Sequence, residues 1–364
     1  MDEIDVVVIG AGQAGLSSAY FLRRFGHDPL VLDSGDGPGG AWRHRSPTLT
    51  MDKVHGVFDL PGIRREADGD GGDGGDDGDD GDDRPAASVV PAYYADYERR
   101  LGLDVRRPVK VTRVEPGPGD RLLITGEDTH RWAARAVVNA TGTWTRPYWP
   151  YYPGAAEFRG RQLHYASYRG PDGFAGRRVV VVGGGHSAAH VLAELAGVAE
   201  ETFWVTRRPP DLRTDDFGEQ ARRDAVAMVE ARVRAGLPPR SVVSVTGLGA
   251  TAVVRQAMEA GALRRLPMFE RITPDGVVWP DGRYEPADVI IWATGFRSAL
   301  DHLAPLRLRE PGGGIKVDGT RAVREPRLHL VGYGPSASTI GANRAGRGAA
   351  RAVHDLLSAS RAAA

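Results

Sequence analysis

The sequence contains no cysteine and almost no lysine. Without cysteine, the chain cannot carry a disulfide framework, a cysteine–zinc site, an iron–sulfur cluster or a dithiol redox centre. Lysine occurs only at Lys53, Lys110 and Lys316, so nearly all of the 47 basic residues are arginine. We interpret this bias as a property of a GC-rich gene. The number of arginines therefore does not indicate nucleic-acid binding, and we expect no nucleic-acid partner.

Long apolar segments are also missing. The uncharged stretch at residues 6–22 follows an acidic start and is interrupted by glycines, which is not typical of a signal peptide. No other segment approaches the ~20 apolar residues that a membrane span requires. The ten histidines show no metal-ligand spacing, so we expect no metal site. These absences predict a cytoplasmic protein without a membrane partner.

The 364 residues suffice for two or three globular domains, but their net charge of zero hides an asymmetry. Residues 68–83 consist only of nine aspartates and seven glycines, and the rest of the chain has 47 basic residues against 38 acidic ones. A basic body suits phosphate-bearing ligands. The tract lacks the terminal glutamate and flanking helices of an EF-hand calcium site. We therefore predict a disordered surface insertion at 68–83.

A dinucleotide-binding pattern opens the chain. The β-branched run at residues 5–9 predicts a buried strand, and the run at 16–25 predicts an amphipathic helix. Between them the loop is formed by Gly10, Gly12, Gln13, Ala14 and Gly15. The first glycine permits a tight turn, the second lets the backbone approach a pyrophosphate, and the third allows close packing of helix and strand.

Asp33 ends the second predicted strand, at residues 29–32. Its carboxylate can accept hydrogen bonds from ribose hydroxyls. The order of strand, glycine loop, helix, strand and acid is the context that a dinucleotide fingerprint requires.

The same pattern recurs later in the chain. A valine strand at 178–182 leads into Gly183, Gly185, His186, Ser187 and Ala188, and Ala188 takes the place of the third glycine. A helix at 190–196 and a strand at 202–206 complete this second unit.

The second unit lacks the acid. Asp33 stands 23 residues after Gly10, and the position 23 residues after Gly183 is Thr206, followed by Arg207 and Arg208. Arginine can grip a 2′-phosphate with two hydrogen bonds, so the first loop suits an unphosphorylated adenosine ribose and the second suits NADPH. The alternative is that these are surface arginines beside a turn.

A second repeated motif supports a doubled domain. Residues 137–142 end in Ala-Thr-Gly, and so do residues 290–295. The distance from the first glycine to this motif is 132 residues in the first unit and 112 in the second, and the tract at 68–83 accounts for most of the difference. We predict an α/β fold of two nested Rossmann-like domains. The first comprises residues 1–150 and 288–364, and the second comprises 151–287.

With these motifs the sequence resembles the flavoproteins that have two dinucleotide-binding domains, with a glutathione-reductase-like FAD/NAD(P)-binding fold. Within them it is similar to the class B flavin-containing monooxygenases, in particular the short bacterial members. The most specific motif is F-x-G-x-x-x-H-x-x-x-Y, whose fixed positions here are Phe158, Gly160, His164 and Tyr168. The Baeyer–Villiger branch continues with tryptophan and then proline or aspartate, whereas Tyr168 and Arg169 stand here, which favours heteroatom oxidation. In the family this motif is mainly structural, so we do not predict His164 to be a catalytic base.

The resemblance implies FAD in the first domain and NADPH in the second, with NADH as an open alternative. Besides the two glycine loops, Asp33 and the two arginines, it implies further cofactor-binding positions. These are Ser34, Gly40, Ala41, Trp42, Arg43, Val111, Thr141, Gly142, Thr294, Gly295, Gly332 and Thr339.

The sequence departs from the family in two places near the expected flavin. The family commonly has an asparagine after the G-G-x-W motif, where this chain has Asp52 followed by Lys53. We take these two residues as catalytic candidates, and a surface ion pair between them is the alternative. The last strand of disulfide-reductase relatives carries an acid, which is missing in residues 332–336 here, so flavin contacts would come from backbone N–H groups.

The resemblance implies that NADPH reduces FAD, that reduced FAD takes up O2 at its C4a carbon, and that the resulting peroxide oxygenates a soft sulfur or nitrogen centre or a ketone. Cofactor chemistry of this kind requires no Ser/His/Asp set. Two alternatives remain: an NADPH oxidase or flavin reductase without oxygen insertion, and a non-catalytic flavin-binding sensor. The expected partners are a small-molecule substrate and O2, and the oligomeric state, including a homodimer, is open.

Overall fold

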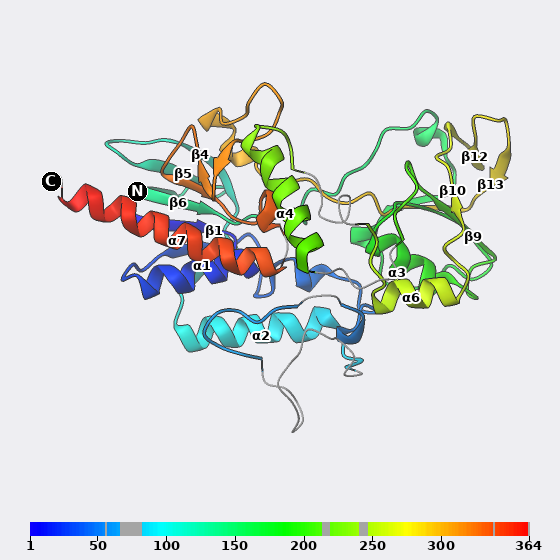
Figure 1. The fold of residues 1–364 in the computed structure, drawn as a ribbon, viewed down its shortest axis with the longest axis horizontal. Helices are drawn as coiled ribbons and strands as arrows, with labels where there is room; N and C mark the ends of the chain where they lie inside the picture. The colour runs from blue at the N-terminus through cyan, green and yellow to red at the C-terminus, as the bar shows by residue number, and fades with distance from the viewer. Residues whose placement is uncertain (55–56, 66–81, 213–218, 240–246, 338, 363–364) are drawn as a thin grey trace.

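The structure is a computed structural model that describes residues 1–54, 57–65, 82–212, 219–239, 247–337 and 339–362. Two parts of unequal size lie side by side and are joined by a narrow connection (Figure 1). Both chain termini lie at the far end of the larger part. Residues 68–81 of the tract predicted to be disordered lie outside the residues that the structure describes.

The larger part is built on a sheet whose central strand is β1 (Asp2–Ile9). This strand runs parallel to β2 (Leu30–Leu32) on one side and to β6 (Arg131–Asn139) on the other. The main strand order is β15-β16-β17-β6-β1-β2-β3, and the β4–β5 hairpin joins it beside β6. The remaining strands are β3 (Val105–Arg106), β4 (Val111–Pro116), β5 (Leu122–Gly126), β15 (Val317–Asp318), β16 (Arg321–Ala322) and β17 (Leu328–Leu330).

Both faces of β1 are covered, which explains its unbroken apolar run. Val6 and Val8 are fully buried against α1 (Gln13–Arg24) and α7 (Thr339–Ala362), which lie side by side in Figure 1. Val7 and Ile9 point to the opposite face and pack with residues of β4, β5 and the short 3-10 helix η5 (Asp301–Leu306). A third helix, α2 (Ala86–Leu101), packs below α1 through three buried tyrosines.

The smaller part has a five-stranded parallel sheet in the order β10-β9-β8-β14-β7. Its strands are β7 (Arg161–His164), β8 (Arg178–Val182), β9 (Glu201–Val205), β10 (Arg265–Leu266) and β14 (Val289–Trp292). Helices α3 (His186–Leu195) and α6 (Ala252–Glu259) pack against each other beside this sheet. A small antiparallel sheet of β11 (Arg271–Thr273), β12 (Gly276–Val278) and β13 (Tyr284–Pro286) completes this part.

These two sheets confirm the predicted α/β class with two nested nucleotide-binding units. The predicted boundaries, however, differ from the observed sheets. Residues 289–292 were expected in the first domain, but β14 pairs with β7 and β8 in the second sheet. Conversely, α4 (Glu219–Arg234) falls inside the expected second domain and packs on the first, where Val233 is buried near Tyr333. Helix α3 also begins at His186, earlier than residue 190.

Two connecting segments form the neck between the parts. They run antiparallel: Tyr148 donates its N–H to the carbonyl of Gly295 at 2.9 Å, and Arg297 donates to Arg146 at 2.8 Å. Ala299 donates to Gly142 at 3.0 Å. These two segments are therefore a hydrogen-bonded pair that connects the two parts. Among the described helices, none combines the length and apolar character needed to cross a bilayer.

Candidate cofactor-binding sites

The first glycine loop lies at the carboxyl end of β1. Gly10 has φ +101°, and a Cβ there would stand 2.6 Å from the carbonyl oxygen of Ala140. A Cβ at Gly15 would come within 1.8 Å of the oxygen of Gly10, so no side chain fits at either position. A Cβ on Gly12 would meet no atom within 4 Å. Two glycines are thus required by packing, whereas Gly12 faces open space.

Helix α1 begins on this loop with Gly12 as its N-cap residue. No side chain caps the helix start, so the N–H groups of its first turn are left to a ligand or to solvent. Helix N-termini with free N–H groups favour phosphate. Gln13 and Ala14 lie in that first turn. Gly332, with φ +73°, lies against Ala14 from the other side.

The second loop repeats these features closely. Gly183 has φ +150°, and its Cβ would meet the carbonyl oxygen of Ala293 at 2.2 Å, as Gly10 would meet that of Ala140. Gly185 faces open space and is the uncapped N-cap of α3, whose first turn contains His186 and Ser187. Ala188 is fully buried, so a small residue is required where the first loop has its third glycine.

Backbone hydrogen bonds show the same internal repeat. Gly10 donates its N–H to Leu32 at 2.7 Å, and Gly183 donates to Val205 at 3.0 Å. In both units the alanine of the Ala-Thr-Gly motif donates at 2.8 Å to the last residue of the glycine-loop strand. The two loops are therefore equivalent in their backbone as well as in sequence.

The acid of the first unit belongs to a buried ion-pair network. The carboxylate of Asp33 accepts a hydrogen bond from Nε of Arg107 at 2.9 Å and from the N–H of Gly35 at 3.3 Å. The other two nitrogens of Arg107 bind Glu98 at 2.7 and 2.6 Å. Burial alone would lower the pKa of Arg107, but the hydrogen bonds that it donates to Glu98 and Asp33 outweigh burial and raise the pKa. Asp33 is thus held in place by two residues that the motif does not include.

The arginines of the second unit lie at the end of β9. Arg207 and Arg208 are exposed, whereas Thr206 is buried. The hydroxyl of Thr206 donates to the carbonyl of Arg208 at 2.8 Å and accepts from Nε of Arg265 at 3.0 Å. Arg265, on the neighbouring strand β10, is therefore a third arginine at this site. Sequence reasoning missed it, because strand order alone brings it there.

The turn that contains the G-G-x-W motif contacts the first glycine loop. A Cβ on Gly40 would stand 2.9 Å from Cα of Gly12, so η1 (Gly40–His44), with Ala41 and Trp42, lies beside the open space. Arg43 pairs with Asp36 and also reaches the carbonyl of Pro38.

Three predicted positions lie around this region. Ser34 is exposed. Val111 is the first residue of β4 and packs, partly buried, against the core, and Val109 before it donates its N–H to the carbonyl of Asp33 at 2.7 Å. Helix α7 begins at Thr339, whose side chain lies outside the described part, as does residue 338.

The threonines of the two Ala-Thr-Gly motifs bind the neck. Thr141 donates its hydroxyl to the carbonyl of Ala299 at 2.6 Å, and Thr294 donates to that of Tyr148. Each hydroxyl therefore fixes the connecting segment that belongs to the other motif. Beside them Gly142 and Gly295 have positive φ, and a Cβ on either would face open space. Because both threonine hydroxyls already donate to the neck, we expect the predicted cofactor contacts of these motifs to come from backbone groups.

The signature histidine is bound on both ring nitrogens. Nδ1 of His164 accepts the N–H of Ala166 at 3.1 Å, and Nε2 lies 3.1 Å from the carbonyl of Gly295. Because a carbonyl only accepts, Nε2 carries the proton. Burial lowers the pKa of His164, which keeps the ring neutral. These bonds agree with a structural role for the signature.

Asp52 lies in the short turn η2 (Met51–Lys53), against helix α6 of the smaller part. In the described part of the chain it makes no ion pair with Lys53, which argues against the surface-pair alternative. Its Oδ1 atom is buried and receives no hydrogen bond from those residues, and neither does the hydroxyl of Thr50 beside it. Both orphaned oxygens lie where the two parts meet.

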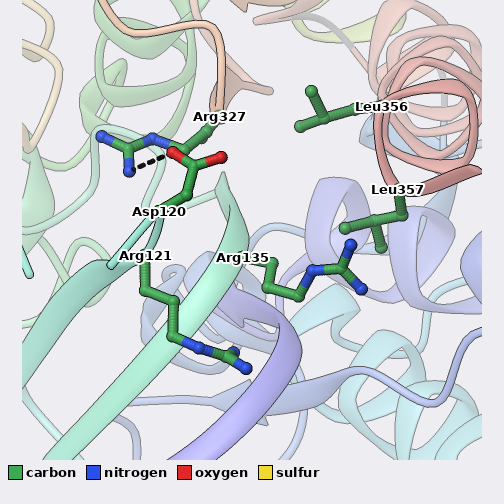
Figure 2. Close-up of a pocket in the computed structure, with 6 residues that line it drawn as sticks. All are labelled: Asp120, Arg121, Arg135, Arg327, Leu356 and Leu357. Carbon is green, nitrogen blue, oxygen red and sulfur yellow. Dashed lines mark hydrogen bonds and ion pairs between the residues drawn. The ribbon is translucent and has the colours of Figure 1, made fainter. Parts of the chain in front are cut away.

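The cavity of about 170 Å³ shown in Figure 2 lies elsewhere. It is near the amino ends of β1 and β17, opposite the glycine loops. Its arginines already have partners: Arg327 pairs with Asp120, Arg121 with Glu3 and Arg135 with Asp5. We assign it no part in cofactor binding.

The two loops fit dinucleotides. Each offers a glycine without obstruction and a helix N-terminus that no side chain caps, with a fixed acid beside the first and arginines beside the second. This is the arrangement of a flavoprotein with two dinucleotide-binding domains. The family model for pyridine nucleotide-disulphide oxidoreductases matches residues 4–333, and the chain belongs to this family, within it to the flavin-containing monooxygenases of class B.

Solved structures and curated proteins support this placement. A flavin-containing monooxygenase from Stenotrophomonas maltophilia is 39% identical, with a TM-score of 0.80, over 97% of this chain and 98% of that one. Flavin-containing monooxygenase FMO GS-OX2 from Arabidopsis thaliana is 32% identical over 56% of this chain and 49% of that protein. This chain thus spans about half the length of that relative. Cyclohexanone monooxygenase, 18% identical with a TM-score of 0.65, shares the fold.

Proposed function

We propose that the protein is an NADPH-dependent flavin monooxygenase that transfers one oxygen atom from O2 to a soft sulfur or nitrogen centre, or to a ketone, of a small molecule. The balanced reaction consumes substrate, O2, NADPH and a proton, and yields oxygenated substrate, NADP⁺ and water. The observation that carries the proposal is the pair of unobstructed glycine loops, one with an acid and the other with arginines. The similarity to flavin monooxygenases supports it.

In this proposal FAD lies on the first loop, with its pyrophosphate over Gly12 and the first turn of α1. Asp33, held by Arg107, accepts hydrogen bonds from the adenosine ribose. When bound, FAD supplies the redox and oxygen chemistry. The chain's own residues bind and orient the cofactors and exclude water from the space between the two parts.

The nicotinamide nucleotide lies on the second loop, over Gly185 and the first turn of α3. Its 2′-phosphate is bound by Arg207 and Arg208, with Arg265 beside them. Each charge-assisted hydrogen bond contributes ~1.5–3 kcal/mol, so the loss of two arginines should reduce the preference for NADPH over NADH at least roughly tenfold. Steady-state kinetics of the Arg207→Ala/Arg208→Ala variant with both nucleotides measure this.

A matched control is Arg264→Ala, which removes an exposed arginine that makes no contact with Thr206. It should keep the wild-type ratio. An unchanged ratio in the double variant would show that the two exposed arginines do not bind the 2′-phosphate.

An NADPH oxidase is the second candidate, because the buried, unpaired oxygen of Asp52 lies where the family commonly has an asparagine amide. Stoichiometry separates the two functions. Purified protein is supplied with NADPH, air and panels of thioethers, amines and ketones, and product and H2O2 are counted per NADPH consumed. A monooxygenase yields product matching NADPH with at least one panel, and an oxidase yields matching H2O2 with all of them.

A further inference from the structure

Arg45 is a partly buried cation at the junction of the two parts, and among the described residues it has no counter-charge. It follows η1, and its side chain is mostly shielded from solvent. Its Nε atom is buried and receives no hydrogen-bond acceptor from the described residues, and none of their carboxylates pairs with it. A buried, unpaired charge is strongly unfavourable. The fold therefore keeps a positive charge for a partner that the described protein residues do not provide.

Two tryptophans hold this side chain in position. The guanidinium carbon of Arg45 lies 4.6 Å from the ring centre of Trp144 and 5.4 Å from that of Trp42. Trp144 is itself stacked on Phe296, so both segments of the neck contribute to the platform. Cation–π contacts orient a guanidinium but leave its charge and its N–H donors available. Arg45 is thus pre-positioned without being neutralised.

A polar group of the smaller part lies near Arg45: the hydroxyl of Tyr165, in the 3-10 helix η4 (Tyr165–Ser167) that follows β7. Arg45 lies close enough to Tyr165 for the two to interact electrostatically, and burial lowers the pKa of the guanidinium. The hydroxyl of Tyr165 interacts in turn with Ser187, in the first turn of α3, and lies 3.1 Å from Nδ1 of His190. Tyr165 therefore connects Arg45 to α3, at whose N-terminus Gly185 leaves open space.

We propose that Arg45 crosses from the first domain to bind the diphosphate of the nicotinamide nucleotide on the second loop. This rests on the proposed function. A diphosphate supplies the anionic oxygens that match a guanidinium, and the N-terminus of α3, which no side chain caps, favours an anion from the opposite side. Arg45 would then strengthen the binding of NADP⁺ and NAD⁺ alike, whereas Arg207 and Arg208 would strengthen the binding of NADP⁺ alone.

The experiment measures dissociation constants by calorimetry on the FAD-loaded protein, with NADP⁺, NAD⁺ and 2′-AMP, which has the 2′-phosphate but no diphosphate. Arg45→Met keeps the apolar stem and removes the charge. It should raise the dissociation constants of NADP⁺ and NAD⁺ at least tenfold and keep that of 2′-AMP within about twofold of the wild-type value. Arg207→Ala/Arg208→Ala should weaken NADP⁺ and 2′-AMP and leave NAD⁺ unchanged. Arg45→Lys, which restores the charge, should recover part of the loss.

The control is Arg146→Met, an exposed neck arginine paired with Asp301, which should bind all three ligands as the wild type does. Flavin absorbance and melting temperature are recorded for every variant. If Arg45→Met binds both dinucleotides as the wild type does, or if its only defect is loss of flavin, Arg45 does not bind the diphosphate. If the wild type binds neither dinucleotide, the proposed function itself fails.

Discussion

Gly12 and Gly348 have the same surroundings in one respect: a Cβ at either position would meet no atom within 4 Å. Gly12→Val therefore should not disturb folding, but it places a branched side chain where the proposed pyrophosphate lies. We expect the purified variant to retain roughly tenfold less FAD than the wild type, with similar far-UV circular dichroism. Gly348→Val, on the exposed side of α7, should remain fully flavinated. Full flavination of Gly12→Val would contradict the assignment of the first loop.

Asp52 combines a buried, unpaired oxygen with a place at the junction of the two parts. A carboxylate can only accept hydrogen bonds when ionised, whereas an asparagine amide can also donate, and a negative charge opposes anionic oxygen species nearby. We expect Asp52→Asn to lower the H2O2 released per NADPH by about twofold or more. Peroxide assays at matched NADPH consumption test this, with Lys53→Met as a separate measure of the neighbouring charge. An unchanged peroxide yield would exclude Asp52 from the oxygen chemistry.

The sequence could predict a site residue when the residues that it contacts lie close to it in the chain. The glycines were predictable because each unit is continuous: strand, loop and helix follow one another at residues 2–24 in the first unit and 178–195 in the second. Arg107 lies 74 residues from Asp33, and Arg265 lies 59 residues from Thr206. Only the order of strands in the sheet brings such pairs together, and one sequence does not reveal that order.

At the scale of elements, the Asp/Gly tract is flanked by two firm attachments. Before it, Tyr93 of α2 receives the N–H of Leu60 at 2.7 Å and donates to Ile63 at 2.6 Å. At its C-terminal end, the carbonyl of Asp82 accepts the N–H of Asp52 at 3.0 Å. The end of the tract is thus hydrogen-bonded to η2, the turn that carries the candidate catalytic residues Asp52 and Lys53.

Deletion of residues 70–80 leaves both attachments intact. Because loop-closure entropy changes slowly with length, we expect FAD content and NADPH turnover to stay within about twofold of the wild type. A longer deletion of residues 70–83 removes the hydrogen bond to Asp52 and should reduce turnover. A large loss in the shorter deletion would show that the tract acts on the site.

Element boundaries also show what periodicity cannot predict. The strands were expected close to where they occur, because apolar β-branched runs between glycines are strong local signals. Helix α4 was expected in the second domain, since it lies between two of that domain's elements in sequence. It packs on the first domain instead, because its apolar residue Val233 finds a buried place near Tyr333. Such a choice depends on tertiary packing.

At the scale of the whole molecule, two buried histidines couple stability to pH. Burial lowers the pKa of His302 to about 4, and burial with the nearby Arg321 lowers that of His329 to about 4. Their unfolded value is 6.5. Below pH 6.5 the unfolded chain therefore binds protons that the folded chain does not. The free energy of unfolding should fall as the pH drops from 6.5 through 4, by up to about 3 kcal/mol for each histidine.

Urea unfolding at several pH values between 7 and 4 measures this decline. His329→Gln can still hydrogen-bond Thr320 but does not titrate, so its stability should fall less steeply than that of the wild type. His44→Gln, which changes an exposed histidine, should follow the wild-type curve. Parallel curves for all three proteins would show that His329 does not contribute.

The neck has a consequence for how the chain can be cut and rejoined. Its two segments are hydrogen-bonded neighbours, so the chain leaves the larger part and returns to it at nearly the same point. Residues 148–295 are in this sense a module inserted into a host, and a short turn joining Arg146 to Arg297 would close the host sheet without stretching it. The host would lose α4, whose removal uncovers apolar surface near Tyr333, and the hydrogen bond of Gly314 to Gly236 that follows it. Grafting α4 back through its own linker would restore that surface, which makes the host suitable for accepting other modules at this point.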